Sequence, residues 1–435
     1  MIKNKTQLNT SPLRRDALKI LEAGYDAICI DRLIKRRVKR SGEKLSIGHI
    51  GKTHKINLSA YMRVHVIGFG KGSYRAVLGI VDILGKHCTS ATVLDVKTSS
   101  YLSSSTSHIK TFFGTHPKPS LANVKATQYI VRLLETASEK DLIVFFVGGG
   151  GSSLLCGSRD EFLKGSKIFD SLTQKGATIK ELNTVRKHLS SVKGGGLAYF
   201  AYPASSVSLI VSDVCGNDLS VIASGPTVYD TTTIQDAKKI LKKYGVRISG
   251  LEFIETQKNK KYFRKTQQLL FACNQDALNA MSKQARTLGY RPRIVSLAYE
   301  GDAHKVFAPL FRNIKKGEVL LLGGETTVKL SKRPERGGRN QEAVLAAVAD
   351  AYEAKTVLSD ALVVSVGSDG YDNTPVAGAL ADEQTLKNVI AKGIKPKEYL
   401  AKNGSYAFFK KVGGHIEVER MSFNVSDLMM VVKRG

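Results

Sequence analysis

The stretch FFVGGGGSS, residues 145–153, joins an apolar run to four consecutive glycines and two serines. The apolar part extends back to residue 142 and has the length of a buried strand. Glycines at a strand end let a bulky or polar group come close to backbone N–H groups. The sequence therefore predicts that the backbone here approaches a phosphate, a carboxylate or another chain segment, and the glycines involved are Gly148, Gly149, Gly150 and Gly151.

Similar apolar runs lie on both sides of this strand in the sequence: VHVIGF (64–69), ATVLDV (91–96) and VSLIVSD (207–213). Each is followed by Gly, Ser or Asp and then by a helix-like segment. Near-continuous apolar strands that alternate with helices indicate a parallel sheet covered on both faces. We predict an α/β fold with a Rossmann-like, doubly wound and largely parallel sheet, whose binding crevice lies at the carboxyl ends of the strands.

A second α/β set follows a polar, lysine-rich stretch at residues 242–266. Its strand-like runs are EVLLLGG (318–324), ALVVSVG (361–367) and DLMMVVK (427–433). A chain of 435 residues is too long for one ordinary core, so two domains are expected. We predict a Rossmann-like domain over 1–255 and a second α/β domain over 256–435.

The net charge of +28 is the unusual feature of the composition. Such a field attracts anions of every kind. No aromatic residues alternate with the basic runs and no zinc-finger or recognition-helix pattern is present, so nucleic acid is not expected as a partner. Five scattered cysteines without a C-x-x-C pair favour reduced thiols in a cytoplasmic protein, and no run is long enough to span a membrane. The oligomeric state stays open between monomer and homodimer.

The segment GFGKGS, residues 68–73, follows the first strand of the predicted sheet. It matches neither a Walker A loop nor an intact dinucleotide fingerprint. Lys71 is nevertheless placed at a glycine-rich turn from strand to helix, where backbone N–H groups favour an anion. The alternative is a lysine in a solvent-exposed turn. Ser152 is not in a G-x-S-x-G elbow, so a serine hydrolase is disfavoured.

The segment TIKELNTVRKHLSSVKGGGLA, residues 178–198, has the spacing of an amphipathic helix that ends at a glycine triplet. Its apolar side contains Leu182 and Val185, and its polar side contains Asn183, Arg186 and Lys187. A polar face with two cations is either solvated surface or the wall of an anion site.

Further glycine-plus-polar clusters occur at other predicted strand ends, in SDVCGNDLSVIASGPT (212–227), GGETTV (323–328) and GSDGYDN (367–373), and RGGRNQE (336–342) places Arg339 and Asn340 at a predicted helix start. Each alone is compatible with an ordinary turn or helix cap. Together they predict one crevice that offers cations to phosphates and carboxylates to a hard metal ion such as Mg²⁺.

In this order, the clusters resemble the type II glycerate kinases, also called the glycerate 2-kinase or MOFRL family. The resemblance covers nearly the whole chain and also includes THP (115–117), GGRNQEAVLAA (337–347) and SVGSDGYDNTPVAGALAD (365–382). It implies two α/β domains with the active site in the cleft between them. It also implies transfer of the γ-phosphoryl group of ATP to the 2-hydroxyl of D-glycerate, with Mg²⁺.

The resemblance assigns two catalytic residues, and the glycine-plus-polar clusters themselves supply the other candidates. Lys71 and Arg339 match the family's principal catalytic positions. Asp213 and Asp369 are the candidate metal ligands. The candidates for nucleotide or substrate binding lie in the glycine-rich and polar clusters, and they are Gly148, Gly149, Gly150, Gly151, Ser152, Asn183, Arg186, Lys187, Lys193, Ser224, Glu325 and Asn340.

The chain departs from the family pattern near its C-terminus, where ERMSFNVSDL (419–428) keeps only Asn424, Val425 and Asp427 of the usual segment. A changed substrate preference and a loss of activity are both compatible with this loop. Two alternatives to the kinase remain. One is a hydroxypyruvate reductase-type oxidoreductase, a label that relatives have carried, which the lack of an intact dinucleotide fingerprint disfavours. The other, which the altered loop supports, is a catalytically silent member that binds anionic polymers through its basic surface.

Overall fold

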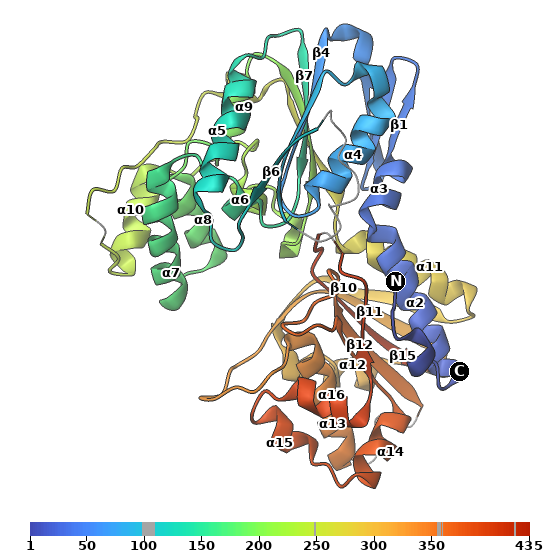
Figure 1. Ribbon diagram of the computed structural model, residues 1–435. Helices are drawn as coiled ribbons and strands as arrows, with labels where there is room; N and C mark the ends of the chain where they lie inside the picture. The colour runs from blue at the N-terminus through green and yellow to red at the C-terminus, as the bar shows by residue number, and fades with distance from the viewer. Residues whose placement is uncertain (98–108, 248, 355–357, 359, 422) are drawn as a thin grey trace. The chain divides into compact units, whose positions relative to one another are not determined.

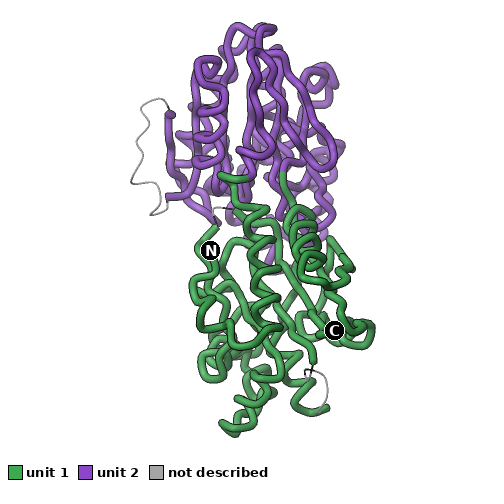
Figure 2. The backbone as a smooth tube through the Cα atoms, turned by 90° about the vertical axis from the view of Figure 1, so that its right-hand side faces the viewer, with its two compact units in different colours: residues 1–32, 272–435 green, residues 33–271 purple. Residues whose placement is uncertain are grey.

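The computed structural model describes residues 1–435 except 98–108, 248, 355–357, 359 and 422. Its internal contacts divide the chain into two compact units (Figure 2). Unit 2 comprises residues 33–271, and unit 1 combines residues 1–32 with residues 272–435. Both are α/β, as predicted, but this division differs from the predicted one, 1–255 and 256–435, at both ends of unit 2.

Unit 2 contains a six-stranded sheet in the order β6-β5-β4-β7-β8-β9. The pairs from β6 through β8 are parallel, which confirms the predicted largely parallel sheet. Every residue of β7, the apolar run before the four glycines, is buried. The strands are β4 (Arg63–Phe69), β5 (Ser90–Val96), β6 (Ile109–Gly114), β7 (Asp141–Val147), β8 (Ser205–Val211) and β9 (Thr266–Ala272).

Helices cover both faces of this sheet, with α4 (Ser73–Leu84) on one side and α5 (Leu121–Glu135) and α9 (Gly196–Ala201) on the other (Figure 1). Ile67 and Phe69 of β4 share an apolar core with α5 and α9. Gly68, between them, faces α4, where an added Cβ would lie 2.5 Å from Val77. This alternation is the doubly wound arrangement that the sequence predicts.

The strand order reverses between β4 and β7. From β4 the chain moves outward through β5 to β6, and from β7 it moves the other way through β8 to β9. The loops after two such strands diverge to opposite faces and leave a crevice between them, which is where open α/β sheets bind ligands. The loop containing Lys71 and the loop containing the four glycines are these two loops.

The remaining elements of unit 2 include an antiparallel three-stranded sheet, β1-β2-β3. They are β1 (Val38–Ser41), β2 (Lys44–His49), β3 (Lys52–Asn57), α6 (Gly151–Leu154), α7 (Ser166–Gln174), α8 (Ile179–Lys187) and α10 (Ile234–Lys243). Helix α3 (Ile30–Arg37) crosses the boundary between the units in the sequence.

Unit 1 contains a mixed sheet in the order β10-β11-β15-β12-β13-β14, parallel only between β10 and β11. Helix α13 begins at Arg339, the predicted helix start, and is buried along most of its length. The elements are α1 (Lys5–Leu8), α2 (Pro12–Ile28), α11 (Asn274–Thr287), β10 (Arg291–Asp302), α12 (Ala308–Asn313), β11 (Glu318–Thr327), α13 (Arg339–Ala354), β12 (Ala361–Gly367), β13 (Gly378–Ala381), α14 (Glu383–Ala391), α15 (Pro396–Leu400), α16 (Ser405–Val412), β14 (His415–Ile416) and β15 (Asp427–Lys433).

The N-terminal segment belongs to unit 1 because α2 packs closely against α11. A Cβ added at Gly24 would lie 2.8 Å from the Met281 side chain, so these helices approach each other at a position without a side chain. All five cysteines are free thiols. Among the described residues, no helix has both the length and the apolar character needed to cross a membrane.

Candidate functional site

The four glycines lie where loops from several strands of unit 2 converge. The Lys71 N–H donates to the Gly149 carbonyl at 2.8 Å, and the Gly148 N–H donates to the Phe69 carbonyl at 2.8 Å. A Cβ at Gly148 would overlap the Lys71 carbonyl oxygen, so the two loops can meet only if this residue is glycine. Of the three predicted alternatives, another chain segment is thus the group that approaches Gly148.

The other three glycines face different neighbours. A Cβ at Gly149 would lie 3.1 Å from the Asp213 carboxylate, and one at Gly151 would lie 2.8 Å from Ala223. Gly150 has a positive φ of 73°, and its Cβ would lie 2.6 Å from the His116 ring. The glycine run therefore brings Lys71, His116 and Asp213 to one place, and we call this set, with Gly148–Gly151, the glycine junction.

The charges of the glycine junction affect one another. Burial lowers the pKa of His116 to about 4, helped by the positive charges of Lys71 and Arg186. Burial raises the pKa of Asp213, against the opposing effect of Lys71. His116 is therefore neutral at neutral pH and lies beside two cations. His116 was not among the predicted site residues, although it occurs in the THP stretch that follows β6.

A hydrogen-bonded chain connects Ser152 with the predicted helix residue Asn183. The hydroxyls of Ser152 and Ser224 lie 2.9 Å apart, and Ser224 donates to the Asn183 side chain at 2.7 Å. Ser224 and its neighbour Ala223 have positive φ values of 60° and 51°, which are strained for residues with a Cβ. Strain of this kind is typical of functional sites, and here it orients the Ser224 hydroxyl.

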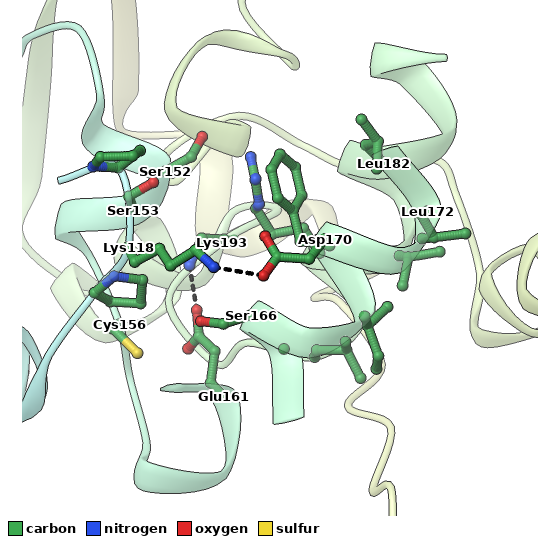
Figure 3. A pocket seen from close by; sticks show the side chains of 18 of the residues that line it. Lys118, Ser152, Ser153, Cys156, Glu161, Ser166, Asp170, Leu172, Leu182 and Lys193 are labelled. Carbon is green, nitrogen blue, oxygen red and sulfur yellow. Dashed lines mark hydrogen bonds and ion pairs between the residues drawn. The ribbon is translucent and has the colours of Figure 1, made fainter. Parts of the chain in front are cut away.

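A pocket of about 60 Å³ opens next to these residues (Figure 3). Ser152 and Ser153 lie on one side of it, and helices α7 and α8 supply an apolar wall. The Arg186 guanidinium lies 4.1 Å from the centre of the Phe169 ring, and burial lowers the pKa of Arg186 to about 10. Within the described part of the chain, no hydrogen bond or ion pair neutralises this guanidinium. A half-buried cation in that state attracts an anionic ligand.

Two other predicted anion ligands have carboxylate partners instead. The buried Lys187 ammonium lies 3.0 Å from the Asp230 carboxylate. The buried Lys193 ammonium bonds to Glu161 and donates to the Leu155 carbonyl at 2.7 Å. Figure 3 shows Lys193 and Glu161 joined in this way. The structure therefore gives both lysines a role in holding α8 and the following loop in place.

In unit 1, the predicted catalytic arginine is held by carboxylates. Arg339 donates from Nε to one oxygen of Asp427 at 2.6 Å and from a terminal nitrogen to the other at 3.0 Å. It also bonds to Glu325. Burial opposes the charge of Arg339, but Asp427, Glu325 and Asp372 together outweigh it and raise the pKa of the guanidinium. The two oxygens of Asp427 thereby fix the plane of the guanidinium.

Asn340 connects this pair to a second buried carboxylate. Its side-chain amide donates to Asp427 at 3.0 Å and to Asp372 at 3.2 Å. Asp372 also accepts the backbone N–H groups of Asn340 and Gln341, at 3.1 and 2.9 Å, and so caps the start of α13. Burial raises the pKa of Asp372. Asp372 and Asp427 were not among the predicted site residues.

The other predicted metal ligand, Asp369, lines a pocket of about 160 Å³ together with Arg339, Asp372 and Asp427. Asn424, from the loop that departs from the family pattern, also lines it. The Asn424 side chain accepts from the Ser368 hydroxyl at 2.6 Å and from the Ser426 N–H at 2.7 Å. Asn424, one of the three residues that the family pattern retains, therefore holds the backbone around residues 424–426 through these two bonds.

Lys71, Asp213 and the glycines belong to unit 2, whereas Arg339, Glu325, Asn340 and Asp369 belong to unit 1. The cleft between two domains that the resemblance implies stays a prediction.

Two family models match the chain: a domain of unknown function, DUF4147, over residues 16–252, and the MOFRL family over residues 318–427. The D-glycerate 2-kinase of Thermotoga maritima is 32% identical over 96% of this chain and 98% of that protein. The glycerate 2-kinase of Pyrococcus horikoshii is 32% identical over 97% and 98%. The crystal structure of the Thermotoga maritima glycerate kinase superposes with a TM-score of 0.81 at 29% identity, covering 96% of this chain and 99% of that one. The chain therefore belongs to the glycerate 2-kinase family, in which a DUF4147 domain is followed by a MOFRL domain.

Proposed function

We propose that the protein is an ATP-dependent glycerate 2-kinase. The 2-hydroxyl oxygen of D-glycerate forms a bond to the γ-phosphorus of ATP while the bond from that phosphorus to the β-γ bridging oxygen breaks, which gives 2-phosphoglycerate and ADP. The observation that carries the proposal is the glycine junction, where a lysine is held at the point where the sheet order of unit 2 reverses. Phosphoryl transfer needs positioning and charge stabilisation, and such a site supplies both.

In unit 2, Lys71 stabilises charge on the transferring phosphoryl group, and Arg186 binds an anionic group of one substrate. The absence of a carboxylate partner for Arg186 among the described residues supports its role. His116 is neutral beside these cations, so its ring can hydrogen-bond the substrate hydroxyl without adding charge, and the Asp213 carboxylate, whose pKa burial raises, is the group of the junction that can accept the hydroxyl proton.

In unit 1, Arg339 contributes a second positive charge. Asp427 and Asn340 act on it as positioning residues, since their hydrogen bonds fix the guanidinium at the start of α13. An arginine held in a defined plane can make two parallel bonds to a phosphate, which a lysine cannot.

Mg²⁺ is part of the proposal. The Asp369 pocket is lined by three carboxylates and one guanidinium, so its excess of negative charge suits a cation. Among the residues that the structure describes, no three His, Cys, Asp or Glu side chains form a ready cage for a metal ion. Mg²⁺ often binds through one or two carboxylates, water and substrate phosphates. Asp369 is the candidate ligand in unit 1 and Asp213 the candidate ligand in unit 2, and an ion held by either carboxylate would neutralise phosphate charge.

The test is product analysis with D-glycerate, ATP and Mg²⁺, using L-glycerate as the control acceptor. ADP release should be accompanied by phosphoenolpyruvate when enolase is added without phosphoglycerate mutase. ADP release without phosphoenolpyruvate would contradict phosphorylation at the 2-hydroxyl. Consumption of NADH with hydroxypyruvate, and no ADP, would favour the reductase, while neither activity would indicate a silent member of the family.

A further inference from the structure

Three tyrosines form one surface cluster in unit 2. Tyr199 and Tyr202 lie close together in the sequence, and Tyr262 comes from a later segment. The Tyr262 ring centre lies 4.8 Å from that of Tyr199 and 5.2 Å from that of Tyr202, in edge-to-face contacts. Tyr199 and Tyr202 remain 37% and 40% exposed. The cluster therefore presents aromatic surface to solvent on a short helix, α9, and a turn that packs against it.

Cations surround this cluster. The sequence QKNKKYFRK, residues 257–265, contains five lysines and arginines and no acidic residue. Its exposed cations are Lys260, Lys261, Arg264 and Lys265. The Lys261 ammonium lies 4.9 Å from the Tyr262 ring centre and 5.9 Å from that of Tyr202. Over the described ranges of the chain, none of these four cations forms an ion pair with a carboxylate.

We propose that these residues, which we call the tyrosine–lysine patch (Tyr199, Tyr202, Lys260, Lys261, Tyr262, Arg264 and Lys265), bind single-stranded nucleic acid. Exposed tyrosine faces stack on unpaired bases of any sequence, and neighbouring cations bind the phosphates between those bases. Neither the stacking on bases nor the binding of phosphates needs a groove, a recognition helix or a base-specific contact. Duplex DNA keeps its bases stacked inside and can use only the cations.

The aromatic residues distinguish this patch from the rest of the basic surface. The three-stranded sheet β1-β2-β3 also exposes Lys39, Lys44 and Lys55, but the residues paired with them across the strands are Ser41, Ser46 and Asn57. That face offers charge without a stacking surface. No nucleic-acid partner was expected from the sequence, in which this basic run contains aromatic residues only at Tyr262 and Phe263. The fold provides that combination by bringing residue 262 next to residues 199 and 202.

The experiment measures fluorescence anisotropy of a labelled oligouridylate with the full-length protein over a range of salt concentrations. Contacts to about four phosphates predict a slope of log K against log [salt] of about −3 for a single strand. Lys260→Glu/Lys261→Glu should weaken binding at least tenfold. The matched control, Lys39→Glu/Lys44→Glu, removes the same charge from the three-stranded sheet and should change binding less than twofold. Equal weakening by both pairs would overturn the proposal, because net charge alone would then explain binding.

The aromatic contribution is tested separately with Tyr199→Ala and Tyr202→Ala. Each should weaken binding to oligouridylate about fivefold or more and leave binding to heparin, a polyanion without bases, unchanged. Equal losses for both ligands, or duplex DNA bound as tightly as the single strand, would overturn the stacking role. Thermal melting shows whether a tyrosine variant is folded, and the lysine variants test the patch independently. The patch includes no residue of the proposed kinase site, so ADP release from D-glycerate and ATP should be unchanged in every variant.

Discussion

At the scale of single residues, Lys71 is the side chain on which the proposed phosphoryl transfer depends most. Lys71→Ala should lower kcat on the order of 100-fold or more, because a positioned charge at the transferring group is lost. The melting temperature should change little, since the loop contacts of Lys71 are made by its backbone. ADP release measures the rate, and Lys86→Ala, which removes an exposed lysine just after α4, is the control. Turnover close to wild type in folded Lys71→Ala would remove Lys71 from the mechanism.

Arg339 tests geometry as well as charge. Its contact with Asp427 uses two nitrogens of the guanidinium in one plane. Arg339→Lys keeps the charge but loses this fork, so kcat should fall nearly as far as in Arg339→Ala, tenfold or more at saturating substrates. Asp427→Asn leaves Arg339 in place but weakens its orientation, and it should lower kcat more than it raises KM for glycerate. Unchanged kinetics in Arg339→Lys would show that any cation is sufficient.

The sequence predicted the location of candidate residues where a strand end or a helix start determines it. Lys71, Gly148 and Arg339 follow strands or begin a helix, and the structure places them at such ends. The sequence did not predict the partners of Lys187 and Lys193, because helical periodicity shows which face a side chain is on but not what lies opposite it. Asp230, the partner of Lys187, is 43 residues further along the chain.

At the scale of secondary-structure elements, two glycine substitutions can distinguish the loss of the glycine junction from the general cost of a side chain at positive φ. Gly150 and Gly176 both have positive φ, 73° and 77°, but a Cβ at Gly176 would meet nothing within 4 Å. Gly176→Ala should therefore cost about 1–2 kcal/mol of stability and leave activity intact. Gly150→Ala also displaces the His116 ring and should lower kcat tenfold or more. Equal activities of the two variants would argue against the junction as a catalytic element.

His415, in the edge strand β14, should make the free energy of unfolding depend on pH. Burial lowers the pKa of His415 from 6.5 to about 4, so between these pH values the unfolded chain binds a proton that the folded protein does not. The free energy of unfolding should therefore rise as the pH increases from 4 to 6.5, and fall as the pH is lowered through that range. His415→Gln should make this dependence shallower. Urea titrations at several pH values measure it, and identical slopes for both proteins would contradict the assignment.

Some element boundaries were predicted incorrectly. The helix expected from residue 178 to the glycine triplet at 194–196 ends at Lys187, and the triplet starts α9 instead of ending α8. Gly195, with φ of 87°, is the N-cap of α9. A glycine with positive φ fits either end of a helix, so the local sequence did not distinguish them. The alternating apolar pattern was more reliable, because burial on both faces of the sheet leaves few alternatives.

At the scale of the whole molecule, the boundary between the two units is set by which elements pack together and not by where the chain is polar and lysine-rich. The lysine-rich stretch suggested a boundary at residue 255, but the next residues lead into β9, which completes the sheet of unit 2. The assignment of residues 1–32 to unit 1 was missed because the partner of α2 lies more than 240 residues later, and apolar periodicity does not identify the partner of a helix.

This boundary predicts how fragments behave. A fragment of residues 30–272 should unfold cooperatively, whereas residues 30–255 lack β9 and leave the edge of β8 unpaired. The shorter fragment also loses Phe271, a fully buried ring that packs edge-to-face against Phe146 at 6.5 Å. It should melt at a lower temperature or aggregate, as shown by circular dichroism and gel filtration. Equal melting temperatures would mean that β9 is dispensable.

The split arrangement of unit 1 has a consequence for synthesis on the ribosome. Leu18, Leu21 and Tyr25 of α2 are fully buried in the finished protein, but α11, which helps to cover them, is translated only after all of unit 2. Residues 33–271 are continuous and can fold as they emerge, while the apolar side of α2 stays uncovered until α11 is made. Nascent chains are thus exposed to chaperone capture at their N-terminus for as long as elongation through the parallel sheet lasts. Stalling before codon 274 should prolong that state, whereas stalling after α11 has left the exit tunnel should end it.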